Sequence, residues 1–185
     1  MPETPLNLAV IIGSTRQGRF GDTIARWFAR QAKPRADMAL DVIDLAELDL
    51  PAVYPSQAVA GVEAYAERIG RADAFVIVTP EYNHGYPASL KQAIDLTHGE
   101  WRAKPVGFVS YGGMSGGLRA VEQLRQVFAE LSTVTVRDTV SFHNAWGRFD
   151  EAGEPRDPAP CEAAAKTMLD DLAWWARALR TARAA

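Results

Sequence analysis

Residues Asn7 to Gly21, NLAVIIGSTRQGRFG, decide the fold of this 185-residue chain. The first part, Asn7 to Gly13, is short, apolar and rich in β-branched residues, which predicts a strand buried on both faces. From Asp22 to Lys33 the apolar residues recur with a helical period, and Pro34 ends that pattern. A buried strand, a glycine-containing turn and an amphipathic helix together indicate the start of a βαβ unit.

The same unit recurs along the rest of the chain. Strands are predicted at Ala39 to Leu45, Ala74 to Thr79, Pro105 to Tyr111 and Thr133 to Val140, and helices at Val62 to Ala72, Pro87 to Thr97, Leu118 to Leu131 and Glu162 to Arg183. Strands that alternate with helices imply a mostly parallel sheet of five strands, covered on both faces. We therefore expect one α/β domain over residues 1–185, with 143–160 as a surface excursion rich in glycine, proline and charge.

The composition disfavours several classes of protein. A formal net charge of −3 with scattered Lys and Arg residues provides no basic stripe for nucleic acid. No apolar run approaches the ~20 residues needed to span a bilayer, and Met1 to Leu6 is too short for a secretory signal, so we expect a cytoplasmic protein that binds no membrane. The single cysteine, Cys161, allows no intrachain disulfide and no Cys/His zinc set, and we expect no metal site.

Function should lie in the loops after the apolar strands, because open parallel sheets bind ligands beyond the carboxyl ends of their strands. The first loop, Gly13 to Gly21, combines glycines, hydroxyl groups, two arginines and a helix N-terminus, which are the components of a phosphate-binding site. A Walker nucleotide site is disfavoured because Arg19 and Phe20 stand where Lys and Ser/Thr are needed. The dinucleotide fingerprint G-x-G-x-x-G fails at Thr15, although Asp44 lies at a plausible distance to hold a ribose. A bound dinucleotide is therefore the second choice, and a plain surface loop remains an alternative.

Two further loops carry residues that suit a ligand. The loop from Thr79 to Pro87 is stiffened by proline at both ends, and its tyrosines and Asn83 suit the face and edge of a planar heteroaromatic ring. The loop from Ser110 to Gly117 contains four glycines in six positions, which allow backbone N–H groups to approach an anionic ring closely. Each loop alone is also explained as a simple turn, with His84 as a solvated side chain. Three such loops on one sheet edge favour a shared ligand site.

Three motifs follow one another in the chain: Gly13-Ser14-Thr15-Arg16 with Arg19 and Gly21, Pro80-Glu81-Tyr82-Asn83 with Gly85 and Pro87, and Ser110-x-Gly112-Gly113-x-Ser115-Gly116-Gly117. In this order they resemble the motifs of the NADPH-dependent FMN reductases, over roughly residues 7–140. The resemblance implies a flavodoxin-like three-layer sandwich, with a five-stranded parallel sheet of order 2-1-3-4-5. It also implies FMN at the carboxyl edge of the sheet, NADPH or NADH as co-substrate, and a homodimer or homotetramer.

The resemblance further implies which residues hold FMN. The candidate cofactor-binding residues are Ser14, Thr15, Arg16, Arg19 and Gly21 in the first loop, Pro80, Glu81, Tyr82 and Asn83 in the second, and Ser110, Gly112 and Gly113 in the third. By the family pattern, Ser14 and Arg16 hold the phosphate, and the other two loops flank the ribityl chain and the ring. Many relatives carry serine and asparagine where this chain has Arg19 and Gly21, so Arg19 is alternatively placed to meet the 2′-phosphate of NADPH.

The predicted activity is hydride transfer from NAD(P)H through bound FMN to a small acceptor, such as a quinone, an azo compound, a free flavin or a metal oxyanion. No dedicated acid or base is required, because the flavin carries the difficult chemistry. The nearest alternative is a flavodoxin-type electron carrier that does not react with a nicotinamide. A second alternative is a non-enzymatic oligomeric module. In that case Trp101, Trp146, Trp174 and Trp175 belong to an assembly surface, although aromatic residues on helices more often lie in the core.

Overall fold

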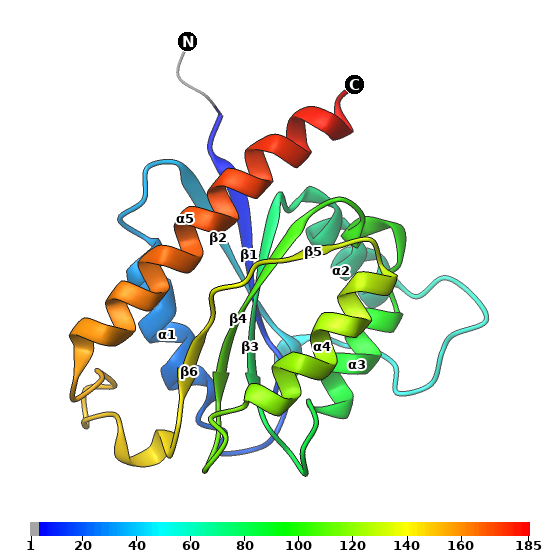
Figure 1. Cartoon of the computed structure of the whole chain (residues 1–185). Coiled ribbons are helices and arrows are strands. Elements are labelled where there is room, and N and C mark those ends of the chain that lie inside the picture. Colours follow the sequence, from blue (N-terminus) through cyan, green and yellow to red (C-terminus); the bar gives the residue numbers. More distant parts are fainter. Residues whose placement is uncertain (1–3) are drawn as a thin grey trace.

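The central sheet has five positions, occupied in the order β2-β1-β3-β4-β5 by parallel strands (Figure 1). The computed structural model describes residues 4–185, so Met1 to Glu3, part of the segment expected to be too short for a secretory signal, lie outside the described residues. The strands are β1 (Leu6–Ile12), β2 (Met38–Asp44), β3 (Ala74–Pro80), β4 (Pro105–Tyr111), β5 (Val134–Thr135) and β6 (Val140–Phe142). The flavodoxin-like order 2-1-3-4-5 is therefore confirmed.

The fifth position of the sheet is shared by two short strands, whereas the sequence predicted one strand region from Thr133 to Val140. β5 pairs with the start of β4, and β6 pairs with its end at Val109 to Tyr111. Between the two strands, the guanidinium of Arg125 donates hydrogen bonds to the carbonyl oxygens of Val136 and Arg137. A side chain thus satisfies carbonyl groups that a continuous strand would direct to a neighbouring strand, and the strand is interrupted there.

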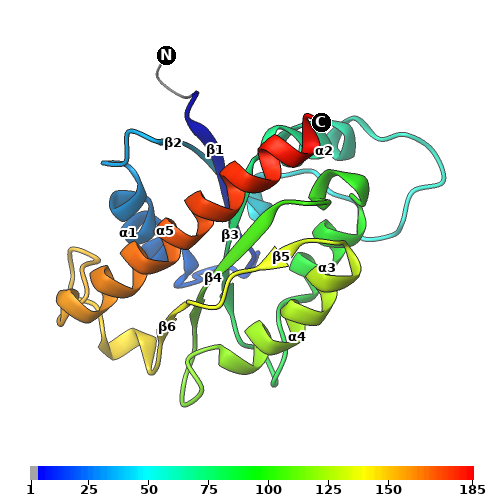
Figure 2. The same cartoon turned by 45° about the horizontal axis from the view of Figure 1, so that its top comes forward.

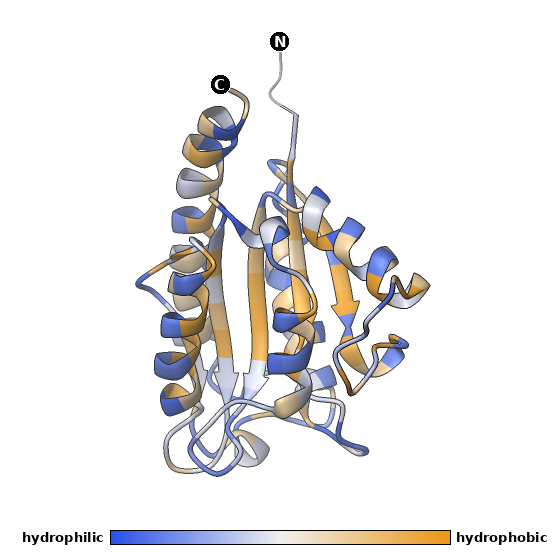
Figure 3. Cartoon of the chain, turned by 90° about the vertical axis from the view of Figure 1, so that its right-hand side faces the viewer, coloured by the Kyte–Doolittle hydropathy of each residue, from blue (hydrophilic) through white to orange (hydrophobic). Residues whose placement is uncertain are grey.

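Helices cover both faces of the sheet (Figure 1, Figure 2). The two on one face are α1 (Gly21–Ala32) and α5 (Pro158–Arg183), and the three on the other are α2 (Ala60–Arg71), α3 (Ala88–Asp95) and α4 (Leu118–Glu130). Alternate residues of β1 point to opposite faces, so Leu8 and Val10 join the core under α1 and α5, while Ala9 and Ile11 join the other core. Figure 3 shows hydrophobic strands between helices whose outer surfaces are mostly hydrophilic. The predicted three-layer α/β sandwich is confirmed.

The excursion predicted at 143–160 is shorter and better anchored than the sequence indicated. α5 begins at Pro158 instead of the predicted Glu162, because proline fits the first turn of a helix, where its missing N–H group needs no partner. Within the excursion, Phe149 and Pro155 are buried and form an isolated β-bridge. The segment is therefore attached to the core at these residues.

The loops after β1, β3 and β4 meet at one end of the sheet, which is the lower end in Figure 1. The parallel register places them there, since Ile12 pairs with Val78 and Pro80 pairs with Tyr111. The expectation that the three loops share one sheet edge is thereby confirmed. Over residues 4–185, no helix is both long enough and apolar enough to cross a membrane.

Candidate functional site

The first loop presents an exposed cation and unpaired backbone donors. Arg16 is exposed, and its guanidinium makes no hydrogen bond or ion pair with another described residue. The backbone N–H groups of Thr15, Gln17 and Gly18 likewise find no hydrogen-bond acceptor among residues 4–185. Gly18 has φ +66°, a left-handed backbone conformation that residues other than glycine rarely adopt. A cation and free N–H groups before the N-terminus of α1 form the kind of concavity that binds phosphate.

Ser14 lies beneath this loop and connects it to the second loop. The residue is fully buried, and its hydroxyl oxygen lies 2.8 Å from the hydroxyl oxygen of Tyr82. The N–H group of Arg16 donates to Ser14 Oγ at 3.4 Å. At the start of α3, Ser89 Oγ donates to the carbonyl oxygen of Gly13 at 3.0 Å. The first loop is therefore attached to both the second loop and α3.

Arg19 differs from Arg16 because its guanidinium is engaged within the protein. Its side chain is 10% exposed, and Nε donates to Asp22 at 2.6 Å. One terminal nitrogen donates to Asp44 at 2.7 Å and also to the carbonyl of Ser14, while the other donates to the second oxygen of Asp44. The hydrogen bond with Asp44, followed by that with Asp22, raises the pKa of Arg19. Arg19 thus links the first loop to β2 and α1, and Asp44, considered above for a ribose, is its partner.

The tip of the second loop is a tight turn from Tyr82 to Gly85. The Tyr82 N–H donates to the Gly85 carbonyl at 2.9 Å, and the Gly85 N–H donates back at 3.0 Å. Between them, Asn83 and His84 have φ of +50° and +71°, the pattern of a type I′ hairpin turn. Non-glycine residues in this conformation cost of order 1–3 kcal/mol each, and such strain concentrates at ligand sites. The turn holds the exposed Asn83 and His84 in one arrangement.

Glu81 joins the second loop to the third. Its side chain is 6% exposed, and Oε2 accepts hydrogen bonds from Ser115 Oγ at 2.6 Å and from the Arg119 N–H at 3.2 Å. Oε1 accepts from Arg119 Nε at 2.5 Å, and a terminal nitrogen of Arg119 completes the ion pair. Burial alone would raise the pKa of Glu81, but the hydrogen bonds from Ser115 and Arg119 outweigh burial and lower the pKa. We call this arrangement of Glu81, Ser115 and Arg119 the loop clamp.

The third loop is shaped by close contacts that only glycine allows. Ser110 Oγ is buried and donates to the Gly116 carbonyl at 2.8 Å, and Ser141 Oγ donates to the same oxygen at 2.8 Å. Gly117 has φ +85°, and a Cβ there would lie 2.7 Å from the Cβ of Ser110. The N–H group of Gly113 has no acceptor among the described residues. The loop therefore presents a free backbone donor at the same sheet edge.

A groove of about 630 Å³ lies between the first and second loops. It is lined by Thr15, Arg16, Glu81, Tyr82 and Asn83, and by Pro87, Ala88 and Ser89 at the start of α3. Its volume falls within the ~300–1,000 Å³ typical of small-molecule sites. The first loop supplies charge and backbone donors, and the second supplies an aromatic ring and a rigid turn. These groups suit a planar ligand that carries a phosphate. We call this cavity the flavin groove, after the ligand that the sequence motifs predict.

Comparison of the chain with known proteins identifies the family to which it belongs. The family model described as NADPH-dependent FMN reductase matches residues 6–147. The chain belongs to this family. It is 37% identical over 140 residues to an NAD(P)H-dependent FMN reductase of Schizosaccharomyces pombe, covering 69% of this chain and 70% of the relative. A quinone reductase of Escherichia coli K12 is 36% identical over 138 residues, covering 71% and 73%. Among solved structures, the NAD(P)H:(acceptor) oxidoreductase FerB of Paracoccus denitrificans shares the fold, with a TM-score of 0.74 and 23% identity over 93% of this chain and 97% of that one.

Membership of the FMN reductase family confirms the predicted class of enzyme, an oxidoreductase that uses FMN and NAD(P)H. The structure brings five of the twelve candidate cofactor residues to the flavin groove, namely Thr15, Arg16, Glu81, Tyr82 and Asn83. The remaining seven are not among the residues that line the groove, and Ser14, Arg19 and Ser110 use their polar groups in contacts within the protein. The three predicted loops thus lie together, and the fold separates the residues that line the groove from those that do not; that these residues bind FMN stays a prediction.

Sequence reasoning missed the residue that explains Gly21. The hydroxyl of Tyr111 is buried and finds no hydrogen-bond partner among residues 4–185, and a Cβ on Gly21 would lie 2.7 Å from it. Burial raises the pKa of this tyrosine. Gly21 is therefore required for packing at the start of α1. Nothing in the local sequence indicates this neighbour, because Tyr111 ends a strand far away along the chain. Arg119 was missed for a similar reason, since it lies beyond the motif on the first turn of α4.

Proposed function

We propose that this reductase passes electrons from NAD(P)H to a quinone-type acceptor, with FMN bound in the flavin groove. The observation that carries the proposal is that Arg16 and Thr15, whose guanidinium and backbone N–H have no partner among residues 4–185, line the same groove as Tyr82. Relatives named quinone reductase in Escherichia coli and Pseudomonas putida support this class of acceptor. Azo compounds, free flavin and metal oxyanions are the acceptors to compare with quinones in the same assay.

The first loop is assigned to the phosphate group. Arg16 supplies a positive charge, and the N–H groups of Thr15 and Gly18 supply hydrogen bonds, which are strong when the acceptor is an anion. Ser14 fixes the base of the loop through Tyr82. Arg19 is assigned to the support of the loop and not to the 2′-phosphate of NADPH, because its donors are already held by Asp22 and Asp44.

The second and third loops are assigned to the ring. Tyr82 and Asn83 line the groove on a rigid turn, and the Gly113 N–H is an available donor for a ring that carries negative charge. When bound, FMN supplies the hydride acceptor and the electron relay. The protein then contributes orientation, because the loop clamp fixes the two loops relative to each other. Pro80, Ser110 and Gly112 are buried and are assigned to the shape of these loops.

We also propose that the chain acts as one domain in a cytoplasmic homodimer or homotetramer. The two hydrophobic cores share one sheet, which supports a single domain. Met114, Leu118 and Trp146 are exposed large hydrophobic residues near the carboxyl edge, and such surfaces are often covered by a second subunit. Sedimentation of the FMN-loaded protein should give a mass above that of one chain, and a monomer at all concentrations would contradict this part of the proposal.

Two measurements test the proposed function. Arg16→Ala should weaken FMN binding by about tenfold or more, because a charge-assisted contact with the phosphate is lost. Arg26→Ala removes an exposed arginine from α1 outside the flavin groove and should leave flavin content unchanged. Equal flavin content in wild type and Arg16→Ala would contradict the assigned phosphate site. Anaerobic mixing with NADPH should bleach the flavin absorbance, whereas the flavin of a simple electron carrier would stay oxidised.

A further inference from the structure

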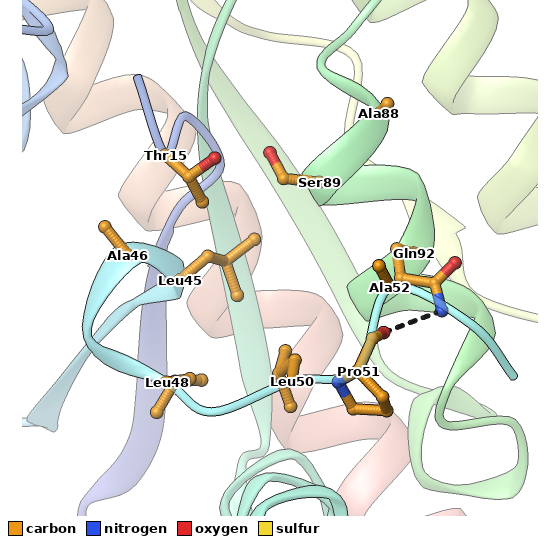
Figure 4. A pocket seen from close by; sticks show the side chains of 10 residues that line it. All are labelled: Thr15, Leu45, Ala46, Leu48, Leu50, Pro51, Ala52, Ala88, Ser89 and Gln92. Atoms are coloured by element: carbon orange, nitrogen blue, oxygen red, sulfur yellow. Dashed lines mark hydrogen bonds between the residues drawn. The ribbon is translucent and has the colours of Figure 1, made fainter. Parts of the chain in front are cut away.

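A second cavity, whose lining residues are drawn in Figure 4, shares lining residues with the flavin groove. It encloses about 460 Å³ between the segment that follows β2 and the start of α3. Leu45, Leu48 and Leu50 line it from that segment, while Thr15 and Ser89 line it from the first loop and α3. We call this cavity the leucine pocket.

Hydrogen bonds hold the walls of the leucine pocket in place. Gln92 Nε2 donates to the carbonyl oxygen of Pro51 at 3.1 Å, which attaches the segment after β2 to α3 (Figure 4). Ser89 Oγ donates to the carbonyl of Gly13 at 3.0 Å and attaches α3 to the first loop. The pocket is therefore formed before a ligand arrives, as is usual for small-molecule sites.

The lining of the leucine pocket selects against charged ligands. Every lining residue is uncharged, and the polar groups among them are hydroxyls and the amide of Gln92. A phosphate or carboxylate would lose its hydration there without gaining a cation, which is strongly unfavourable. The flavin groove differs in this respect, since Arg16 and Glu81 line it. A neutral, apolar group is the ligand that the leucine pocket fits.

The two cavities share walls, so a molecule held in the leucine pocket can reach a ligand held in the flavin groove. Thr15, Ala88 and Ser89 line the leucine pocket and also the flavin groove. We propose that the leucine pocket binds the apolar side chain of a neutral quinone while the reducible ring of the same molecule contacts the FMN that the flavin groove holds. This inference rests on the proposed function and deepens it, because it predicts a preference for quinones that carry an alkyl or prenyl chain over the bare ring.

The test fills the pocket and compares two acceptors. Ala52 lines the leucine pocket and is exposed, so Ala52→Phe should fold and block it. Ala58→Phe adds the same ring to the same loop at an exposed position outside the lining, and it serves as the matched control. Initial rates with NADPH are measured for para-benzoquinone and for its decyl derivative. Ala52→Phe should lower kcat/KM about tenfold for the decyl quinone, the effect of withdrawing about two buried methylene groups, and should leave para-benzoquinone unchanged.

A binding measurement separates this inference from the proposed function. Equilibrium dialysis of the decyl quinone against the oxidised, FMN-loaded protein should show about tenfold weaker binding to Ala52→Phe, and no change with Ala58→Phe. Equal effects of Ala52→Phe on both quinones would overturn the assignment, as would equal effects of the two variants. A change of oligomeric mass in Ala52→Phe would also overturn it, because a second copy of the chain would then occupy the pocket. If wild type reduced no quinone at all, the proposed function would fail, while dialysis would still test the pocket.

Discussion

The loop clamp should control both the stability of the reductase and its affinity for FMN. Glu81→Gln removes the charge of a side chain that is 6% exposed and accepts hydrogen bonds from Ser115 and from two groups of Arg119. Without that charge the second and third loops lose their main polar connection. We therefore expect both loops to move more freely in the absence of ligand. FMN then binds more weakly, because part of its binding free energy is used to order them.

The magnitude follows from the contacts. A hydrogen bond to a charged group contributes about 1.5–3 kcal/mol, but the Arg119 side chain is 46% exposed, so water replaces part of what is lost. A net loss of about 2 kcal/mol is expected, which corresponds to a fall in Tm of about 4–8 °C for a chain of this length. The same free energy, expressed in binding, weakens FMN affinity by about tenfold or more. Because the pKa of Glu81 is lowered, this contribution is complete above the ordinary value of 4.5 and is lost as the pH falls below it.

A double-mutant cycle measures the clamp directly. Glu81→Gln, Arg119→Met and the double variant are unfolded with urea, and their FMN affinities are measured by fluorescence titration. The pair Lys91 and Asp95, whose side chains are 40% and 43% exposed, gives the control cycle and should show a coupling of at most about 0.5 kcal/mol. A coupling between Glu81 and Arg119 no larger than that of the control pair, or unchanged FMN affinity, would refute the reasoning.

Two further predictions concern the fold around the site. Gly21→Ala should lower the free energy of unfolding by about 1–3 kcal/mol, because the added Cβ would lie 2.7 Å from the Tyr111 hydroxyl. In urea unfolding, the double variant with Tyr111→Phe should recover most of this loss. If it recovers nothing, the packing explanation is wrong. Burial, helped by the charge of Arg183, lowers the pKa of Lys104 from 10.5 to about 8. The unfolded chain therefore binds more protons between these pH values, so the free energy of unfolding should rise with pH across that window, by about 3 kcal/mol at most. Unfolding curves at several pH values should show a flatter rise in Lys104→Met but not in Lys33→Met, and identical slopes would contradict the assignment.

Local sequence was sufficient to predict the elements that position the site. The strand predicted at Asn7 to Gly13 is observed as β1, and apolar runs of this kind are recognisable because burial on both faces leaves no polar position. The order of the strands followed from the resemblance of the loop motifs, since periodicity does not specify which strands pair. The division between β5 and β6 was not predictable, because it depends on a contact between Arg125 and Val136 that only the folded chain forms.

In the candidate site too, contacts that form only in the folded chain could not be predicted from the sequence. Arg16 and Arg19 have the same chemistry and lie in the same loop, so the sequence assigned both to the ligand. The fold distinguishes them: Asp44 at the end of β2 holds Arg19, and no described residue holds Arg16. Carboxylate partners of this kind come from separate elements, and their identity depends on tertiary structure. Motifs therefore predicted which loops hold the ligand, whereas packing determined which of the two guanidinium groups has no partner among residues 4–185.

The most direct test of the central claim compares two flavins that differ only in the phosphate group. Protein freed of cofactor is titrated with FMN and with riboflavin, and binding is followed by the quenching of flavin fluorescence. If the first loop binds phosphate through Arg16 and its free N–H groups, FMN should bind about a hundredfold more tightly than riboflavin, and most of that difference should vanish in Arg16→Ala. Equal affinities for the two flavins in wild type would contradict the account.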